Sequence, residues 1–152
     1  MTMKKAGILI LLFFSIISCR PNFGLAEEKQ VGSTDMLCEC IEATTPQLNE
    51  YSFGVLEYAA ENQDADIEEH IEEVRSSLSG KELDEFNQHI NYFLENDFDE
   101  MFVVCGGPIL EEYPELDEMD DEVLVDMFLY NLDEEECEKT YRLLQIYKAL
   151  NL

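Results

Sequence analysis

Two histidines and a large excess of carboxylates are the side chains of this chain that could support proton transfer. His70 and His89 each lie within a strong helical pattern of apolar residues, and Glu85 precedes His89 by one helical turn, a spacing typical of an ion pair. The sequence has no His-Glu-x-x-His, Glu-x-x-His or Gly-x-Ser-x-Gly motif, and no glycine loop of the kind that holds phosphates. Carboxylate pairs such as glycosidases use arise by chance in so acidic a chain. We therefore expect a protein that is not an enzyme and needs no cofactor.

The N-terminal segment that ends at Cys19 has the composition of an export signal. Lys4 and Lys5 precede an apolar run over residues 6–17, which is too short for a membrane-spanning helix of about 20 residues. The sequence Ile16-Ile17-Ser18-Cys19 at its end resembles the lipobox of bacterial lipoprotein precursors. This resemblance implies cleavage before Cys19, a lipid attached to its sulfur and an acylated new N-terminus.

Export and composition together suggest how the chain is divided and where it works. We expect a signal peptide over residues 1–18, a flexible tether over 19–35 that begins with the lipidated cysteine, and an acidic helical domain over 36–152. The protein would be a lipid-anchored membrane protein of the cell envelope, because several acyl chains together hold a protein firmly on a bilayer. Cleavage after Gly24-Leu25-Ala26 is the alternative, and it would release a soluble secreted or periplasmic protein.

Four cysteines remain once export processing has removed Cys19 from the thiol pool. Cys38, Cys40, Cys105 and Cys137 are an even number in a chain sent to an oxidising compartment, which predicts two disulfides. A Cys38–Cys40 bridge would close a very small ring, and two pairings stay open, both of which join the start of the domain to Cys105 and Cys137. Each bridge would stabilise the fold by about 4–5 kcal/mol in the chain-entropy model. Zinc binding by Cys-Glu-Cys is the weaker alternative, since zinc sites seldom use that spacing, and we expect no metal site.

The charge balance limits the class of partner. The chain has 35 acidic and nine basic residues, and no Lys or Arg lies between Lys81 and Lys139. Nucleic acid is excluded as a partner because phosphate binding depends on Lys and Arg. Direct adhesion to an anionic bilayer is disfavoured for the same reason, so contact with the membrane would depend on the lipid anchor. A basic protein partner or a divalent cation suits such a field, and the alternative is that the charge serves only solubility.

Apolar residues recur at helical spacing through most of the mature chain and predict an all-α domain. The clearest feature is a helical hairpin, with apolar faces over 67–78 and 83–94 that meet at Ser79-Gly80-Lys81-Glu82, a capping-box spacing. Thr45-Pro46 predicts an earlier helix start, and Gly106-Gly107-Pro108 predicts the end of a later helix, followed by an irregular loop. Residues 101–104 should be helical because no other segment offers a strand partner. We expect a small bundle of about five or six short helices, stapled by disulfides.

Two acidic stretches are candidates for binding. The first, which we name the contact patch, consists of eight carboxylates around a predicted helix start, where they could also serve only to stabilise that helix. Its members are Glu111, Glu112, Glu115, Asp117, Glu118, Asp120, Asp121 and Glu122. The second stretch, residues 62–73, has part of an EF-hand spacing, but Asn62 holds the first ligand position and Ile67 stands where the turn needs glycine. Weak divalent-cation binding is the most that this stretch predicts, and a helix cap is the other interpretation.

These features predict a non-enzymatic binding module for a basic protein partner in the cell envelope. In a sharper form the protein would be an inhibitor or immunity-type protein against a cationic toxin or hydrolase, because an acidic face speeds capture of such a partner and can cover its active site. The alternatives are a structural or assembly lipoprotein of the envelope and a calcium-binding envelope protein.

Overall fold

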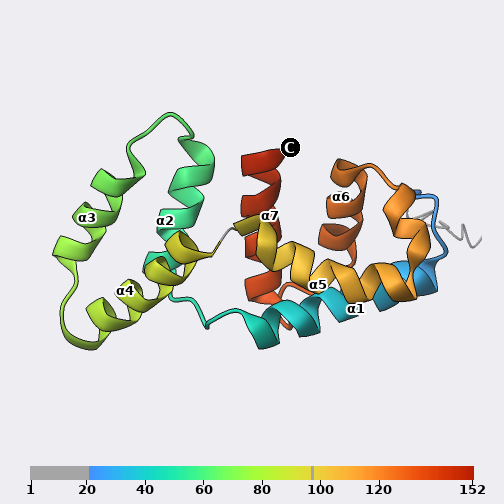
Figure 1. Cartoon of the computed structure of the whole chain (residues 1–152), viewed down its shortest axis with the longest axis horizontal. Helices are drawn as coiled ribbons and strands as arrows, with labels where there is room; N and C mark the ends of the chain where they lie inside the picture. Colours follow the sequence, from blue (N-terminus) through green and yellow to red (C-terminus); the bar gives the residue numbers. More distant parts are fainter. Residues whose placement is uncertain (1–20, 97) are drawn as a thin grey trace, which may run out of the picture.

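The computed structural model describes residues 21–96 and 98–152, and within these ranges the chain is all-α, without strands (Figure 1). The helices are α1 (Glu27–Thr44), α2 (Glu50–Glu61), α3 (Ile67–Ser77), α4 (Gly80–Glu95), α5 (Phe98–Glu112), the 3₁₀-helix η1 (Pro114–Glu118), α6 (Asp121–Asn131) and α7 (Glu138–Asn151). The all-α class is confirmed. The seven α-helices exceed the expected five or six because the segments around Met36 and Phe98 form full-length helices.

The helices bury two groups of apolar side chains. The larger core lies between α1, α5, α6 and α7, where Ile41, Met127 and Leu143 are fully buried. The smaller core lies between α2, α3 and α4, around Phe86 and Ile90. In Figure 1, α3 and α4 stand at one end of the molecule and α2 lies between this pair and α7. The helical hairpin expected from the sequence is therefore confirmed, and α2 packs against both of its helices.

Helix α1 begins at Glu27, within the segment that we expected to be tether. Ser33 and Thr34 are buried in this helix, and their hydroxyl groups donate to the carbonyl oxygen of Gln30 over 3.0 and 2.7 Å. Because the hydroxyls are satisfied within their own helix, this polar stretch can pack against other helices without a large desolvation cost. The helical body thus starts earlier than Met36, and 21–26 are the described residues that precede it.

Helix α5 continues through Gly106-Gly107-Pro108, where the sequence predicted its end. Pro108 lacks a backbone N–H and weakens this turn, but it lies on the exposed side of the helix. Cys105 and Ile109 are buried on the opposite side, where α5 packs on α1. That packing, together with the disulfide between Cys40 and Cys105, outweighs the poor local propensity. The predicted stop and the irregular loop after it are wrong, whereas a helix at 101–104 is confirmed.

Caps set the helix starts, and one of them differs from the prediction. Asn49 begins α2, since its Oδ1 accepts a hydrogen bond from the backbone N–H of Ser52 over 2.9 Å. Thr45 instead ends α1, and its hydroxyl donates to the carbonyl oxygen of Ile41, so the predicted start at Thr45-Pro46 is wrong. Ser79 precedes α4 as expected, but its side chain makes no capping bond.

Two disulfides fasten α1 to distant parts of the chain. Cys38 bonds to Cys137 and Cys40 bonds to Cys105, with Cα–Cα distances of 5.8 and 5.7 Å, which selects one of the two pairings left open by the sequence. Cys38 and Cys40 are two positions apart on a helix and so face different neighbours. The two bonds indicate an oxidising, extracytoplasmic location. Among the helices of the described ranges, none is long and apolar enough to cross a membrane.

Next to the disulfide at the start of α7, helices α1 and α7 cap each other. The buried ammonium group of Lys139 donates to the carbonyl oxygens of Glu42 and Thr45 over 3.1 and 3.0 Å. In return, Oε1 of Glu42 accepts hydrogen bonds from the backbone N–H and the hydroxyl of Thr140, both over 3.2 Å. A cation therefore lies at the C-terminal end of α1 and a carboxylate at the N-terminal end of α7, as the helix dipoles favour. We call this pair of contacts the reciprocal cap.

Candidate binding surface

All eight carboxylates of the contact patch are exposed. Glu111 and Glu112 end α5, and the remaining three at the far end of the stretch surround the start of α6. Between these two groups, η1 carries Glu115, Asp117 and Glu118. In Figure 1 this stretch lies at the end of the molecule away from α3 and α4. The fold thus gathers the predicted residues at one end, on three consecutive elements.

Contacts with α1 and the core hold the middle of the contact patch in place. Leu116 of η1 is 1% exposed and anchors this short helix in the larger core. The carboxylate of Glu115 pairs with the ammonium of Lys29, and this hydrogen bond lowers the pKa of Glu115 and raises the pKa of Lys29. Gly32 lies against Tyr113, so closely that a Cβ there would come within 2.3 Å of the tyrosine hydroxyl oxygen. Helix α1 therefore determines where the acidic stretch stands.

The carboxylates at the start of α6 differ in what they do. Oδ1 of Asp120 accepts a hydrogen bond from the backbone N–H of Glu122 over 3.1 Å and so caps the helix. Asp121 is the first helical residue, is exposed, and its carboxylate has no hydrogen-bond or ion-pair partner among the described residues. Stabilisation of the helix start thus accounts for Asp120, while Asp121 remains available to a ligand.

Within the ranges 21–96 and 98–152, every Lys and Arg side chain forms an ion pair with a carboxylate of the same chain. These six Lys and Arg residues each have a carboxylate within ion-pair distance. The pairs are Lys29 with Glu115, Arg75 with Glu72, Lys81 with Glu85, Lys139 with Glu42, Arg142 with Glu50 and Glu57, and Lys148 with Asp126. Of the 35 acidic residues of the chain, 34 lie in the same ranges, so most carboxylates there have no basic partner. An approaching cationic protein would therefore meet little repulsion.

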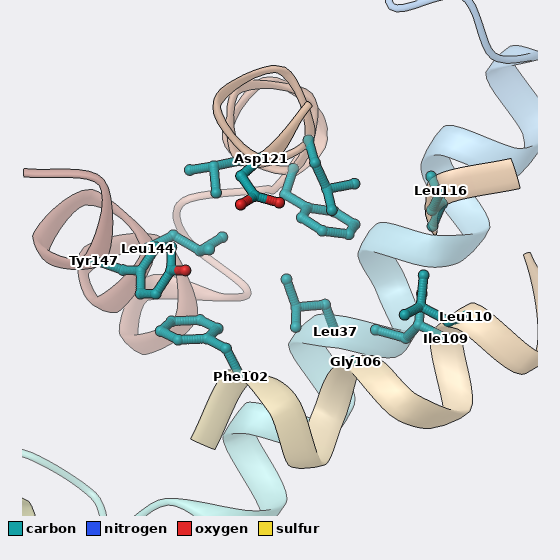
Figure 2. Close-up of a pocket in the computed structure, with 12 residues that line it drawn as sticks. Leu37, Phe102, Gly106, Ile109, Leu110, Leu116, Asp121, Leu144 and Tyr147 are labelled. Atoms are coloured by element: carbon teal, nitrogen blue, oxygen red, sulfur yellow. The ribbon is translucent and has the colours of Figure 1, made fainter. Parts of the chain in front are cut away.

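An apolar pocket lies beneath the start of α6 (Figure 2). Its volume is about 140 Å³, and side chains from α1, α5, α6 and α7 together with Leu116 enclose it. Aromatic rings contribute to three of its walls, from Phe102, Phe128 and Tyr147. Among the described residues, Asp121 is the one charged residue that lines it, and Figure 2 shows its carboxylate directed into the space above the apolar floor. The pocket thus adjoins the contact patch and shares one carboxylate with it.

His89 has a structural partner and not the predicted one. Its Nδ1 lies 3.1 Å from Oγ of Ser52, which lies 2.9 Å from Oδ1 of Asn49. Because this Oδ1 accepts from the serine hydroxyl, Nδ1–H of His89 donates to Oγ, and the imidazole links α4 to the start of α2. Burial lowers the pKa of His89 and favours its neutral form. The predicted partner Glu85 pairs with Lys81 instead.

The second acidic stretch forms the start of α3. Oδ1 of Asp66 accepts hydrogen bonds from the backbone N–H groups of Glu68 and Glu69 over 3.1 and 3.2 Å. The ring of His70 in the same turn stacks on Tyr58, with 3.8 Å between the ring centroids. Within the described residues, no group of three or more Cys, His, Asp and Glu side chains is placed to hold a metal ion. The carboxylate of Asp66 therefore acts as a helix cap.

Sequence reasoning named the carboxylates of the contact patch, whose binding role stays a prediction, and missed the pocket and the reciprocal cap. Both features join residues that are far apart in the chain, and no local pattern records such contacts. Gly106 was the one local signal of the pocket, because a glycine has no side chain and so leaves space in the wall that α5 forms. Cys19, the predicted lipidation site, and the predicted signal peptide over 1–18 lie outside the described residues.

Comparison with known proteins adds no relative from which a role could be transferred. No family model, curated protein or solved structure matches this chain.

Proposed function

We propose that the protein is a lipid-anchored binding module of the cell envelope that engages a basic protein partner and catalyses no reaction. The observation that carries the proposal is the distribution of charge. Eight exposed carboxylates lie at one end of the molecule, while all six Lys and Arg residues of the described ranges are paired with carboxylates of the same chain. A cationic partner is attracted over a long range by such a surface.

The stiffness of the domain supports the sharper form of the proposal, an inhibitor or immunity-type protein against a cationic toxin or hydrolase. Two disulfides and the reciprocal cap hold α1 against α5 and α7, and contacts of Lys29 and Gly32 of α1 with Glu115 and Tyr113 position the middle of the contact patch. A surface that is ordered before binding loses little conformational entropy when it meets its partner. Such a surface can cover an active site tightly.

The location is the other part of the proposal. The disulfides require an oxidising compartment, and a lipid on Cys19 would hold the domain at a membrane surface within it. The chain from residue 20 to the start of α1 would then serve as a short connection between lipid and domain. A toxin or hydrolase that enters or acts in the envelope would meet the protein there.

The test is the association rate between the protein and basic proteins from the envelope and secreted fractions of the producing cells, measured by surface plasmon resonance at increasing salt. Electrostatic steering raises association rates by roughly 10- to 1,000-fold, and salt screens this gain. We expect a steep fall of the rate with salt, and a fall of about tenfold or more at low salt when the contact patch is replaced by Ser and Gln.

A matched control separates the contact patch from net charge. The control variant neutralises eight other exposed carboxylates, around α3 and α4: Glu61, Asp64, Glu68, Glu69, Glu73, Glu82, Asp84 and Glu95. We expect it to lower the rate much less than the contact-patch variant does. Equal effects of the two variants would contradict the assignment of the patch. A stable complex that is insensitive to salt would favour a structural or assembly lipoprotein, and saturable calcium binding at fixed stoichiometry would favour a calcium-binding protein.

A further inference from the structure

The pocket beneath α6 has the size and composition of a site for one side chain of a partner. A dry cavity of about 150 Å³ holds a molecule the size of benzene, and this one measures about 140 Å³. Leu116 and Leu144 in its lining are 1% and 2% exposed, whereas Asp121 at its rim is exposed. A ligand that lies across the apolar floor would therefore have Asp121 beside it at the rim.

The single charge at the rim restricts what kind of group this would be. The carboxylate of Asp121 is directed into the pocket in Figure 2, and no described residue satisfies it. An anion would be repelled by Asp121 and by the contact patch around it. A purely apolar group would fill the floor but would leave the carboxylate without a partner. A group with an apolar stem and a cationic head would satisfy both parts.

The aromatic walls distinguish between the two long basic side chains. Phe102 and Tyr147 pack against each other in the wall, with 4.8 Å between their ring centroids and an angle of 59° between their planes, and Phe128 lines the same pocket. A guanidinium group is planar, stacks on aromatic rings and binds a carboxylate through two parallel hydrogen bonds. An ammonium group is more strongly hydrated and lacks this geometry.

We propose that this pocket receives one arginine side chain of the basic partner, with the guanidinium on Asp121 and the stem on the apolar floor. The inference rests on the proposed function, because it specifies how the same end of the molecule would hold a basic protein. The contact patch would govern the rate of association, and the pocket would govern the lifetime of the complex.

The experiment uses two small probes that differ only in charge. N-Propylguanidinium reproduces the end of an arginine side chain, and N-propylurea is its neutral counterpart of nearly the same shape. Each is titrated into the protein while the methyl NMR signals of Leu37, Leu124 and Leu144 are recorded. We expect saturable shifts with the guanidinium probe and a dissociation constant that rises about threefold to tenfold in Asp121→Asn, between the values typical of an exposed ion pair and a charge-assisted hydrogen bond. The dissociation constant of N-propylurea should differ less than twofold between the unchanged protein and Asp121→Asn.

Two matched controls test where the probe binds. Glu82→Gln removes an exposed carboxylate of α4 that neither lines the pocket nor belongs to the contact patch, and it should leave both titrations unchanged. Gly106→Leu directs a larger side chain into the pocket from α5, where a Cβ would meet no atom within 4 Å, and it should abolish the shifts. Gly107→Leu makes the same change on the exposed side of the helix and should have no effect on the probe.

The results distinguish the pocket from the proposed function. Absence of saturable shifts, equal binding of the two probes, or unchanged binding in Gly106→Leu would overturn the arginine site. If a basic partner still associates in a salt-dependent manner in Gly106→Leu with an unchanged dissociation rate, the proposed function stands and the pocket inference fails. If the probe binds as expected but no basic protein associates, the pocket stands as a guanidinium site and the proposed partner class fails.

Discussion

Replacement of Lys139 by Met tests whether the reciprocal cap stabilises the fold. The side chain of Lys139 is 3% exposed, and its ammonium donates two hydrogen bonds to carbonyl oxygens at the C-terminal end of α1. Methionine has a similar length but no donor, so the carbonyl of the buried Thr45 would lose its partner. The carboxylate of Glu42, which is half-exposed, would keep its bonds to Thr140.

The expected loss follows from these contacts. A hydrogen bond from a charged group contributes about 1.5–3 kcal/mol, so two such bonds set an upper limit of about 6 kcal/mol. The removal of a buried ammonium recovers part of its desolvation cost, which offsets the loss. We therefore expect Lys139→Met to lower the free energy of unfolding by about 2–4 kcal/mol, a large part of the 5–15 kcal/mol typical of a domain.

The assay is urea unfolding followed by far-ultraviolet circular dichroism, with both disulfides intact. Lys148→Met is the matched control, because Lys148 lies on the same helix and pairs with Asp126 at the surface. An exposed pair of this kind contributes little to stability, because water and salt screen it. If Lys139→Met costs no more than Lys148→Met does, Lys139 does not act as a cap and the argument from its burial is refuted.

Three further predictions rest on single features of the fold. Replacement of both Cys38 and Cys137 by Ser should lower the free energy of unfolding by about 4–5 kcal/mol in urea titrations, because the disulfide closes a loop of about 100 residues; a cost below 1 kcal/mol would contradict this. The lowered pKa of His89 means that the unfolded chain binds its proton first, so stability present above about pH 6.5 is lost as the pH falls through the native pKa, and His89→Gln should show a flatter pH dependence of the unfolding free energy. Gly32→Ala should cost about 1–3 kcal/mol by crowding the hydroxyl of Tyr113, and Tyr113→Phe should recover part of that loss, which a thermal-melt double-mutant cycle would detect as coupling.

Local patterns predicted the elements whose stability is mainly local or amphipathic. The hairpin of α3 and α4 follows directly from the spacing of its apolar residues, and Ser79 marks its second start correctly. The same reasoning failed at Pro108, where burial of the opposite side of α5 overrides a poor helix sequence. It also failed at Ser33 and Thr34, whose hydroxyls bond within the helix and allow a polar stretch to be buried.

Features that depend on tertiary contacts were only partly accessible. The number and location of the disulfide cysteines follow from composition, but the choice between the two pairings depends on which side of α1 each cysteine faces. The contact patch was visible as a run of carboxylates. The distinction between Asp120, which caps α6, and Asp121, which lines the pocket, required the arrangement of four helices around Leu116.

Mass spectrometry of the native protein, isolated from the producing cells without reduction, tests the extracytoplasmic, lipid-anchored module most directly. Intact mass together with a peptide map should reveal a chain that begins at an acylated Cys19 and contains the Cys38–Cys137 and Cys40–Cys105 bonds. A chain that retains residues 1–18, carries no lipid and has four free thiols would contradict the account.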